Sequence, residues 1–469
     1  MKPHLLLKIL SIILFISCGT KRTPVAKIDL DKIQKRGRLI AMTGYSATSY
    51  FIYKGQPMGY EYELLTRLAN HLGLELEIVL ENNLDELFRK LNAGEGDLIA
   101  HGLTVTKSRK ELVDFTDYLF TTQQVLVQRK PEKWRQMKLH EIKNALITNP
   151  IDLAGKKVYV KEKSSHYYRL KNLSDEIGGE IEIISVGGDT TSEQLMAMVA
   201  QGQIDYTIAD QHVAQINQSF FDNLDVNTPI SLPQQIAWAV RKTSPNLLQV
   251  INEWIATMKK STDYYVIYNK YFKNRGAFIR RAKSAYLSVT GGKISTYDDL
   301  IKKQAEQLGW DWRLLAALVF QESQFDPNAR SWSGAMGLMQ LMPRIGKNFG
   351  AKNLLNPAEN LKAGVKYLIW LDEYWQKIVP DPEERIKFIL ASYNVGIGHV
   401  QDARNLAAKY GKNPAVWEGN VAEYILKLSG KEFYTDPVVQ YGYCRGMEPV
   451  NYVDEILQRF EQYCTFIAG

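Results

Sequence analysis

The hydrophobic pattern divides the chain into two parts with different periodicities. From residue 31 to about 275, short apolar runs of strand type alternate with segments of helical spacing, as in α/β domains. This pattern predicts strands at 39–42, 76–80, 157–160, 181–184 and 206–209, and helices at 62–72, 85–93 and 192–200. After about residue 297 helical spacing takes over, with helices expected at 298–308, 312–321, 360–375 and 382–393. We therefore expect an α/β domain at 31–275 and a mainly α-helical domain at 298–469.

The segment between the two domains, residues 276–297, is polar and basic and contains Gly291-Gly292. Such a composition is typical of a linker. A chain of 469 residues is also too long for one hydrophobic core, and it shows no low-complexity tract or repeat. A multidomain protein is the expected architecture.

The first residues have the layout of an export signal. Lys2 and Lys8 precede the apolar run Ile9–Ile16, which is too short to span a bilayer and ends in small residues. Cys18 follows the expected cut after residue 17, and this arrangement resembles the bacterial lipoprotein signal. The resemblance implies a signal peptide at 1–17 and a tether at 18–30, lipidated on Cys18, on the periplasmic face of the outer membrane of a Gram-negative bacterium. The alternative is an ordinary signal peptide with an incidental cysteine.

Charge and cysteine content narrow the possible partners. The formal net charge is +7, but Lys and Arg are spread along the chain, so nucleic acid is not an expected partner, whereas an anionic polymer such as cell wall fits. Cys444 and Cys464 would meet an oxidising compartment, and the sequence leaves open whether they form a disulfide. Metal-ligand spacing is not found among His and Cys residues, so neither a metal nor a cofactor is expected.

Several motifs of the first domain resemble the periplasmic solute-binding proteins that capture polar amino acids. They are Gly59–Leu64, Gly94–Ile99, Leu103–Arg109, Val113–Thr116 and Asp152–Val158. The resemblance implies a two-lobed type II fold whose guanidinium pairs with a ligand carboxylate and whose carboxylate accepts the ligand ammonium. Its matching positions are Arg109, Asp210, Thr104 and Ser164. The chain departs from the family at 163–165, where a glycine usually precedes the Ser or Thr.

From the residues alone, Arg109 is equally a solvated residue at a helix start, and Asp210 a helix cap. A free amino acid or a wall-derived peptide is the expected ligand. Because two-lobed binders close around their ligands, such a ligand is expected to regulate or target the second domain.

One acidic residue of the second domain stands out by its surroundings. Glu322 ends an apolar helix that contains the run Leu314–Phe320. Burial against such neighbours raises the pKa of a carboxyl group, which is the condition for a general acid near neutral pH. The alternative is a helix-end Glu bound to backbone amides.

The residues after Glu322 complete a long motif. Gln321–Ala329 and Ser331–Pro343, together with Ala391–Gly396 and Asn451–Val453, resemble the soluble lytic transglycosylase domain, which has a goose-lysozyme-like fold. The resemblance implies that Glu322 is catalytic and that the following residues contact substrate: Ser323, Ser333, Met339, Gln340, Tyr393, Asn394 and Tyr452. For the Met and the aromatic residues the alternative is core packing. The combination of both domains resembles the membrane-bound lytic murein transglycosylases of type F.

The chemistry implied by this resemblance needs one carboxyl group rather than two. Asp326 stands before Pro327 in an expected helix-stop loop and is interpreted as structural. The N-acetyl group of the substrate then serves as nucleophile, a known exception among glycosidases. The expected reaction cleaves the bond between N-acetylmuramic acid and N-acetylglucosamine in peptidoglycan and leaves 1,6-anhydromuramyl ends. Alternatives are hydrolysis on the same fold, or a tethered solute receptor whose second domain only docks on the wall.

Overall fold

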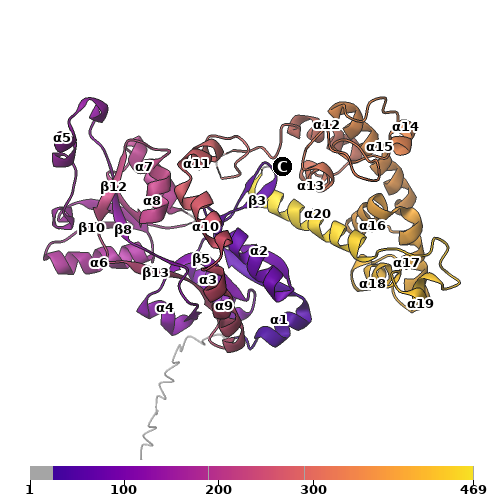
Figure 1. Cartoon of the computed structure of the whole chain (residues 1–469), viewed down its shortest axis with the longest axis horizontal. Coiled ribbons are helices and arrows are strands. Elements are labelled where there is room, and N and C mark those ends of the chain that lie inside the picture. The colour runs from indigo at the N-terminus through magenta and orange to yellow at the C-terminus, as the bar shows by residue number, and fades with distance from the viewer. Residues whose placement is uncertain (1–24, 189, 290, 468–469) are drawn as a thin grey trace, which may run out of the picture.

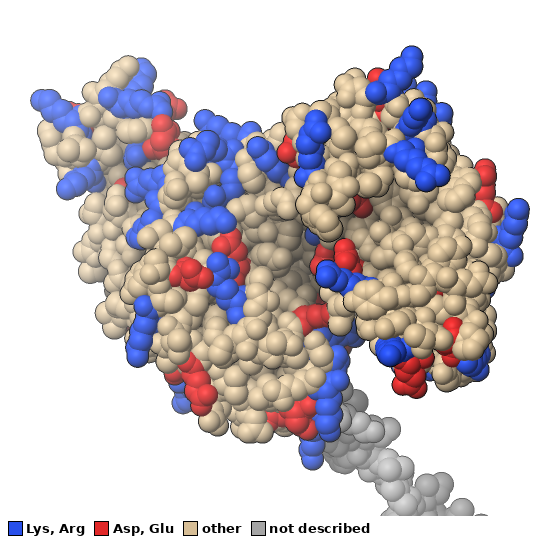
Figure 2. Space-filling model, turned by 45° about the vertical axis from the view of Figure 1, so that its right-hand side comes forward, with Lys and Arg blue, Asp and Glu red and all other residues tan. Residues whose placement is uncertain are grey.

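The computed structural model describes residues 25–467 except 189 and 290. The predicted signal peptide, Cys18 and residues 19–24 of the predicted tether lie outside the described residues. Two α/β lobes are followed by a helical domain, and α20 runs from the helical domain to the β3 hairpin of the first lobe (Figure 1). In the space-filling view a hollow separates the two parts on the side facing the viewer (Figure 2).

The first lobe is built on a six-stranded sheet with the order β4-β1-β5-β13-β6, in which β7 also pairs with β13. The strands are β1 (Arg38–Thr43), β4 (Glu75–Leu80), β5 (Leu98–Thr104), β6 (Asp114–Phe115), β7 (Phe120–Thr122) and β13 (Gln234–Val240). β1 lies parallel to β4 and β5, whereas β13 is antiparallel to β5. A separate hairpin joins β2 (Phe51–Tyr53) and β3 (Gln56–Met58). The helices are α1 (Leu30–Arg36), α2 (Tyr60–Leu72), α3 (Leu84–Ala93), α4 (Lys107–Leu112), α9 (Pro245–Met258) and α10 (Thr262–Tyr268), followed by a π-helical turn at Asn269–Lys273.

The second lobe is built on a five-stranded sheet with the order β10-β9-β11-β8-β12. Its strands are β8 (Gln124–Arg129), β9 (Lys157–Lys161), β10 (Glu182–Val186), β11 (Tyr206–Asp210) and β12 (Leu224–Pro229). Its helices are α5 (Leu139–Asn144), α6 (Ser165–Ile177), α7 (Ser192–Gln201) and α8 (Gln211–Gln218), with 3-10 turns at Trp134–Gln136 and Pro150–Leu153. The chain enters this lobe after β7 and leaves it before β13, so two adjacent segments connect the lobes.

The helical domain surrounds one large apolar core. Its helices are α12 (Asp298–Leu308), α13 (Trp312–Ser323), α14 (Pro343–Asn348), α15 (Pro357–Gln376), α16 (Pro382–Val395), α17 (Ile397–Lys409), α18 (Ala422–Lys427), α19 (Lys431–Tyr434) and α20 (Met447–Phe466), with a π-helical turn at Trp417–Val421. The expected strands and helices of both domains are present with ends shifted by at most three residues, which confirms the fold class. Their local periodicity was sufficient because each element buries one apolar face.

The connector at 276–297 is packed rather than loose. It begins within α11 (Arg275–Ala282), where Phe278 is buried. Leu287 belongs to the apolar core of the first lobe and Ile294 to that of the helical domain. Ser288 accepts a hydrogen bond from the backbone N–H of Ile52, 2.8 Å away. Although this segment is polar in composition, its few apolar residues attach it to the cores of both domains.

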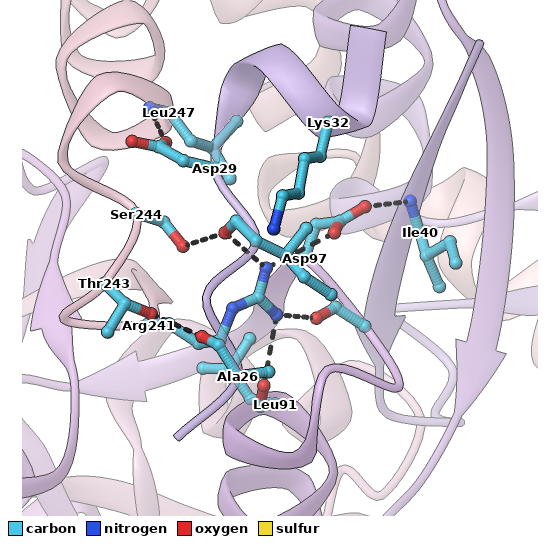
Figure 3. Close-up of polar contacts among 12 residues, drawn as sticks. Ala26, Asp29, Lys32, Ile40, Leu91, Asp97, Arg241, Thr243, Ser244 and Leu247 are labelled. Carbon is cyan, nitrogen blue, oxygen red and sulfur yellow. Dashed lines mark hydrogen bonds and ion pairs between the residues drawn. The ribbon is translucent and has the colours of Figure 1, made fainter. Parts of the chain in front are cut away.

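A buried polar cluster holds the first described residues on the first lobe (Figure 3). Arg241 is fully buried and donates to the carbonyl oxygens of Ile28 and Leu91, each at 3.1 Å, and its Nη2 lies 3.4 Å from Asp97 Oδ1. Thr243 donates to the carbonyl oxygen of Ala26 at 2.6 Å. The backbone is thus fixed from Ala26 onward, because a buried guanidinium needs all these acceptors.

Candidate active site and ligand site

Glu322 lies in the last turn of α13. This helix begins at an Asp311 cap, whose side chain accepts a 2.8 Å hydrogen bond from the N–H of Arg313, and its middle residues are buried in the domain core. It ends in two successive non-glycine residues in the left-handed region, Gln324 with φ 51° and Phe325 with φ 65°. This tight turn separates Glu322 from the following loop, and such a conformation persists only where its surroundings hold it.

Tyr452, on α20, donates a hydrogen bond from its hydroxyl to Glu322 Oε1. Burial raises the pKa of Glu322 to about 7, and the Tyr452 hydrogen bond lowers it in part. Burial, together with the nearby Glu322, holds the pKa of Tyr452 well above its usual value, so this hydroxyl keeps its proton and acts as a donor. The pKa of this carboxyl group therefore lies close to neutral pH, which suits both proton donation and proton acceptance.

The loop between α13 and α14 is fastened to three helices. Ser323 donates from Oγ to the carbonyl oxygen of Leu338 at 2.8 Å, and Tyr393 donates to the carbonyl oxygen of Met339 at 2.6 Å. Asn360 on α15 accepts from the N–H of Met339 at 2.8 Å. Ser323 and Tyr393 therefore position this loop beside Glu322 with their polar groups. Asn360 has the same role and was not predicted.

Three other predicted substrate residues of this domain lie differently from one another. Met339 is fully buried in the core, where its sulfur packs against Gly364, so the expectation that it faces a sugar ring is wrong. Gln340 folds back and donates to the carbonyl oxygens of Gly337 at 2.9 Å and Ala329 at 3.1 Å. Ser333 is exposed and shares a 2.8 Å hydrogen bond with the hydroxyl of Ser331.

Asn394 follows Tyr393 on α16, and its Oδ1 is a buried acceptor with no hydrogen-bond partner within the part of the chain that the structure describes. An unpaired buried acceptor costs free energy unless a ligand or water satisfies it. Asp326 is exposed and accepts from the N–H of Asn328 at 2.9 Å, as a turn residue does. Glu322 thus remains the candidate proton donor.

A cavity of about 140 Å³ lies between the two lobes of the first domain. The lobes touch around it: Lys161 donates to the carbonyl oxygen of Asn82 at 2.5 Å, and Lys163 pairs with Asp85 at 2.7 Å. Several titratable side chains line the cavity: Glu61, His101, Lys161, Glu193, Asp210 and His212. A small polar cavity therefore lies between two lobes that contact each other, where the solute-binding resemblance predicts a ligand site.

Asp210 lines this cavity, but the other three predicted ligand residues do not. Burial would raise the pKa of Asp210, yet the neighbouring His166, His212 and Arg109 together lower it. Arg109 donates from Nη1 to the carbonyl oxygen of Thr104 at 2.9 Å.

Ser164 is the N-cap of α6 and donates to the carbonyl oxygen of Lys161 at 2.7 Å. The hydroxyl of Thr104 lies 3.4 Å from that of Ser165 in the other lobe. Of the four predicted residues, Asp210 alone lines the cavity.

Glu61 and Glu193 line the cavity and were not predicted. Glu61 accepts a 2.7 Å hydrogen bond from the indole of Trp238, and burial raises its pKa to about 7. Burial also raises the pKa of Glu193 and lowers the pKa of His101 and of His212 to about 4. Glu61 precedes the expected helix at 62–72 and belongs to the motif Gly59–Leu64, which was the available signal for it.

The domain contact joins both sites. Tyr463 on α20 donates to the carbonyl oxygen of Gly55 in the β2–β3 hairpin at 2.9 Å. Gln56 of the same hairpin donates to Gln324, directly after the Glu322 helix, at 3.1 Å. At the end of α20, Phe466 stacks on Tyr45, a residue of the cavity wall, with ring centroids 4.0 Å apart. One helix therefore touches Glu322 at one end and the wall of the ligand cavity at the other.

Several other features can be stated for the described residues. Within 25–467, apart from 189 and 290, no group of three or more His, Cys, Asp and Glu side chains has the geometry of a metal site. Over the same residues, none of the helices has the length and apolar character needed to cross a membrane. Cys444 and Cys464 are both free thiols, which answers the question that the sequence left open.

Comparison with known families agrees with this architecture. Residues 39–274 match the model of bacterial extracellular solute-binding proteins, family 3, and residues 299–416 match the transglycosylase SLT domain. Among solved structures, the P235GK mutant of ArgBP from T. maritima is 28% identical and covers 52% of this chain and 99% of its own, with a TM-score of 0.43. Fold and site together define an enzyme that acts on peptidoglycan, a lytic transglycosylase with a solute-binding type II domain in front of its helical domain.

Relatives over nearly the full length identify the family. The membrane-bound lytic murein transglycosylase F of Desulfosudis oleivorans is 35% identical over 92% of this chain and 90% of its own length. The protein of the same description from Shewanella sediminis is 34% identical over 97% of this chain and 91% of its own. The chain belongs to the membrane-bound lytic murein transglycosylase F family.

Proposed function

We propose that Glu322 carries out both proton transfers of the lytic reaction. It donates its proton to the glycosidic oxygen between N-acetylmuramic acid and N-acetylglucosamine, and the C1–O bond breaks. The N-acetyl carbonyl oxygen of the muramyl residue bonds to C1 and holds the positive charge. Glu322, now a carboxylate, accepts the proton of the muramyl 6-hydroxyl, whose oxygen bonds to C1 and releases the N-acetyl group. The 1,6-anhydromuramyl end forms, and Glu322 is protonated again without consuming water.

The observation that carries this proposal is the half-buried carboxyl group whose pKa lies at about 7 with one tyrosine donor on it. A carboxyl group with an ordinary pKa would be deprotonated at neutral pH and would not donate. Asn394, whose Oδ1 lacks a partner among the described residues, is proposed to bind the substrate next to Glu322.

The test is digestion of purified peptidoglycan by the wild-type chain, followed by mass spectrometry of the products. Anhydromuramyl ends lack one water relative to hydrolysed ends. A product with reducing muramyl ends would identify a hydrolase and contradict the proposed second step. Wall binding without any cleavage would instead favour the tethered receptor.

We propose that the cavity between the lobes binds a small ligand with an ammonium group, a free amino acid or the end of a wall peptide. Asp210 would accept the ammonium, because its carboxylate lines the cavity and its Oδ1, which lies 3.7 Å from His166 Nε2, has no hydrogen-bond partner among the described residues. Calorimetry with amino acids and wall peptides tests this proposal. Asp210→Asn should weaken the binding of any ligand found by about tenfold or more, since a hydrogen-bonded charge pair contributes about 1.5–3 kcal/mol.

We further propose that this ligand alters the rate of the Glu322 domain through α20. The stacking of Phe466 on Tyr45 and the bond from Tyr452 to Glu322 place both sites on one helix. A coupling of about 1–3 kcal/mol changes the rate about five- to 150-fold. Phe466→Ala should leave ligand binding intact and remove the response of wall digestion to ligand. If the rate of wall digestion by the wild type is the same with and without bound ligand, the first domain is a targeting module.

Finally, we propose that Cys18 carries a lipid that holds the enzyme on the periplasmic face of the outer membrane. The pinned backbone begins at Ala26, eight residues after Cys18. A fully extended chain of that length reaches at most about 29 Å. The first lobe would then stay close to the membrane surface.

A further inference from the structure

An uncharged aromatic surface lies beside the active site. Phe349, Tyr367 and Trp370, here called the aromatic platform, line an open hollow of about 400 Å³ together with Ile345, Asn348 and Ile397. Trp370 is 46% exposed although its neighbours Phe349 and Tyr367 are partly buried. The six lining residues include no Asp, Glu, Lys or Arg, and the side chain of Asn348 is exposed.

Neighbouring helices hold the platform in place. Tyr367 and Trp370 stand three residues apart on α15, so they share one face of the helix, and their rings stack with centroids 5.9 Å apart at an interplanar angle of 22°. Phe349, at the end of α14, contacts Tyr367 with a centroid distance of 5.4 Å. The platform is therefore rigid, and a rigid aromatic face loses little entropy when a ligand settles on it.

The platform continues the active site. Tyr367 contacts Tyr393 with ring centroids 5.4 Å apart, and burial, together with the nearby charge of Glu322, raises the pKa of Tyr393. Trp370 is thus two ring contacts away from Tyr393. Ile397, on the other side of the hollow, begins α17 three residues after Asn394.

We infer that the aromatic platform is a remote subsite for sugar rings of the glycan strand, several residues away from the bond that is cut. A pyranose presents apolar C–H groups on its faces and hydroxyls at its edge, which matches aromatic faces with one amide at the rim. The volume lies within the range of about 300–1,000 Å³ for ligand pockets. This inference rests on the proposed cleavage at Glu322. Trp370 would then contribute part of the free energy with which the enzyme binds long strands.

The test compares strands of different length. Peptide-free glycan strands are separated into tetrasaccharides and long chains, and kcat/KM is measured on each. Trp370→Ala should lower kcat/KM on long strands by about tenfold, the loss of roughly 1.4 kcal/mol of binding, and change it by less than about twofold on tetrasaccharides. Trp370→Phe, which keeps an aromatic face, should recover most of the loss.

Tyr410→Ala is the matched control. Tyr410 is 47% exposed and stacks on Tyr424, but it follows the opposite end of α17 from Ile397, about 20 Å away at the helical rise. Its substitution should leave both substrates unaffected, and thermal unfolding of both variants checks that the fold is kept. An equal loss on short and long strands, or no loss on either, overturns the subsite.

A loss for Trp370→Ala that appears only on peptide-bearing strands overturns it as well, because the platform would then bind stem peptides. If the wild-type enzyme cleaves no strand at all, the proposed reaction fails rather than the subsite.

Discussion

The Tyr452→Phe substitution tests directly how the Tyr452 hydroxyl controls the pKa of Glu322. The Tyr452 hydroxyl donates to Glu322, and a donor stabilises the carboxylate more than the neutral acid. Removal of that hydroxyl should therefore raise the pKa of Glu322 above its value of about 7. Cleavage starts from the protonated acid, so the activity of the enzyme falls as pH rises through this pKa. The variant should retain activity to higher pH than the wild type.

The size of the shift follows from the strength of the lost bond. A hydrogen bond to a charged group contributes about 1.5–3 kcal/mol, and one pKa unit corresponds to about 1.4 kcal/mol. The expected upper limit is thus about two units, and about one unit remains if water replaces part of the lost donation. The midpoint of the alkaline limb of kcat/KM should move from about pH 7 towards about pH 8, because kcat/KM reports groups of the free enzyme.

The assay is the initial rate of release of anhydromuropeptides from peptidoglycan across pH at low substrate concentration. Tyr463→Phe is the control, because Tyr463 is a buried tyrosine of the same helix whose hydroxyl bonds to Gly55 rather than to Glu322. That control should leave the midpoint unchanged. An unchanged or lowered midpoint in Tyr452→Phe would refute the assignment of Glu322 as the proton donor whose pKa is set by burial and by the Tyr452 hydrogen bond.

Three further outcomes are expected. Glu322→Gln should reduce peptidoglycan cleavage by about 10²- to 10⁴-fold while wall pelleting persists, and activity within about tenfold of the wild type contradicts its role. Cys18→Ala should move the protein from the membrane fraction to the soluble fraction, and membrane retention after a high-salt wash would place the anchor elsewhere. Gly55→Ala puts a methyl group 2.7 Å from Phe325 and should destabilise the fold by about 1–3 kcal/mol more than Gly37→Ala, which has the same φ of 78° in open space. Equal thermal unfolding of these two variants would contradict the packing of the hairpin.

The local elements of this fold were predictable because each carries its own periodic signal. The helix of Glu322 is an example: its apolar run predicted burial, and burial accounts for the raised pKa. The prediction of Glu322 as the acid therefore rests on a physical argument as well as on a motif.

Motif membership alone did not separate ligand contacts from packing. Met339 stands inside the motif, yet its side chain is packed against Gly364. A Cβ at position 364 would lie 2.2 Å from the Met339 sulfur, so only a glycine leaves room for the buried methionine. Ser164 and Arg109 likewise match binding positions, but Ser164 caps α6 and Arg109 donates to the carbonyl oxygen of Thr104 at the end of β5. The side chain that faces a cavity is decided by packing between elements, which local sequence does not encode.

The contact between the domains had no sequence signal at all. Tyr463 and Gly55 are 408 residues apart, and Ile52 of the first lobe is buried in the core of the helical domain. The local pattern assigns Ile52 to its own hairpin, because the other residues of that core belong to the connector and the helical domain, far away in the sequence. An isolated helical domain would expose this surface to water, so we expect each domain to depend on the other for stability as well as for regulation.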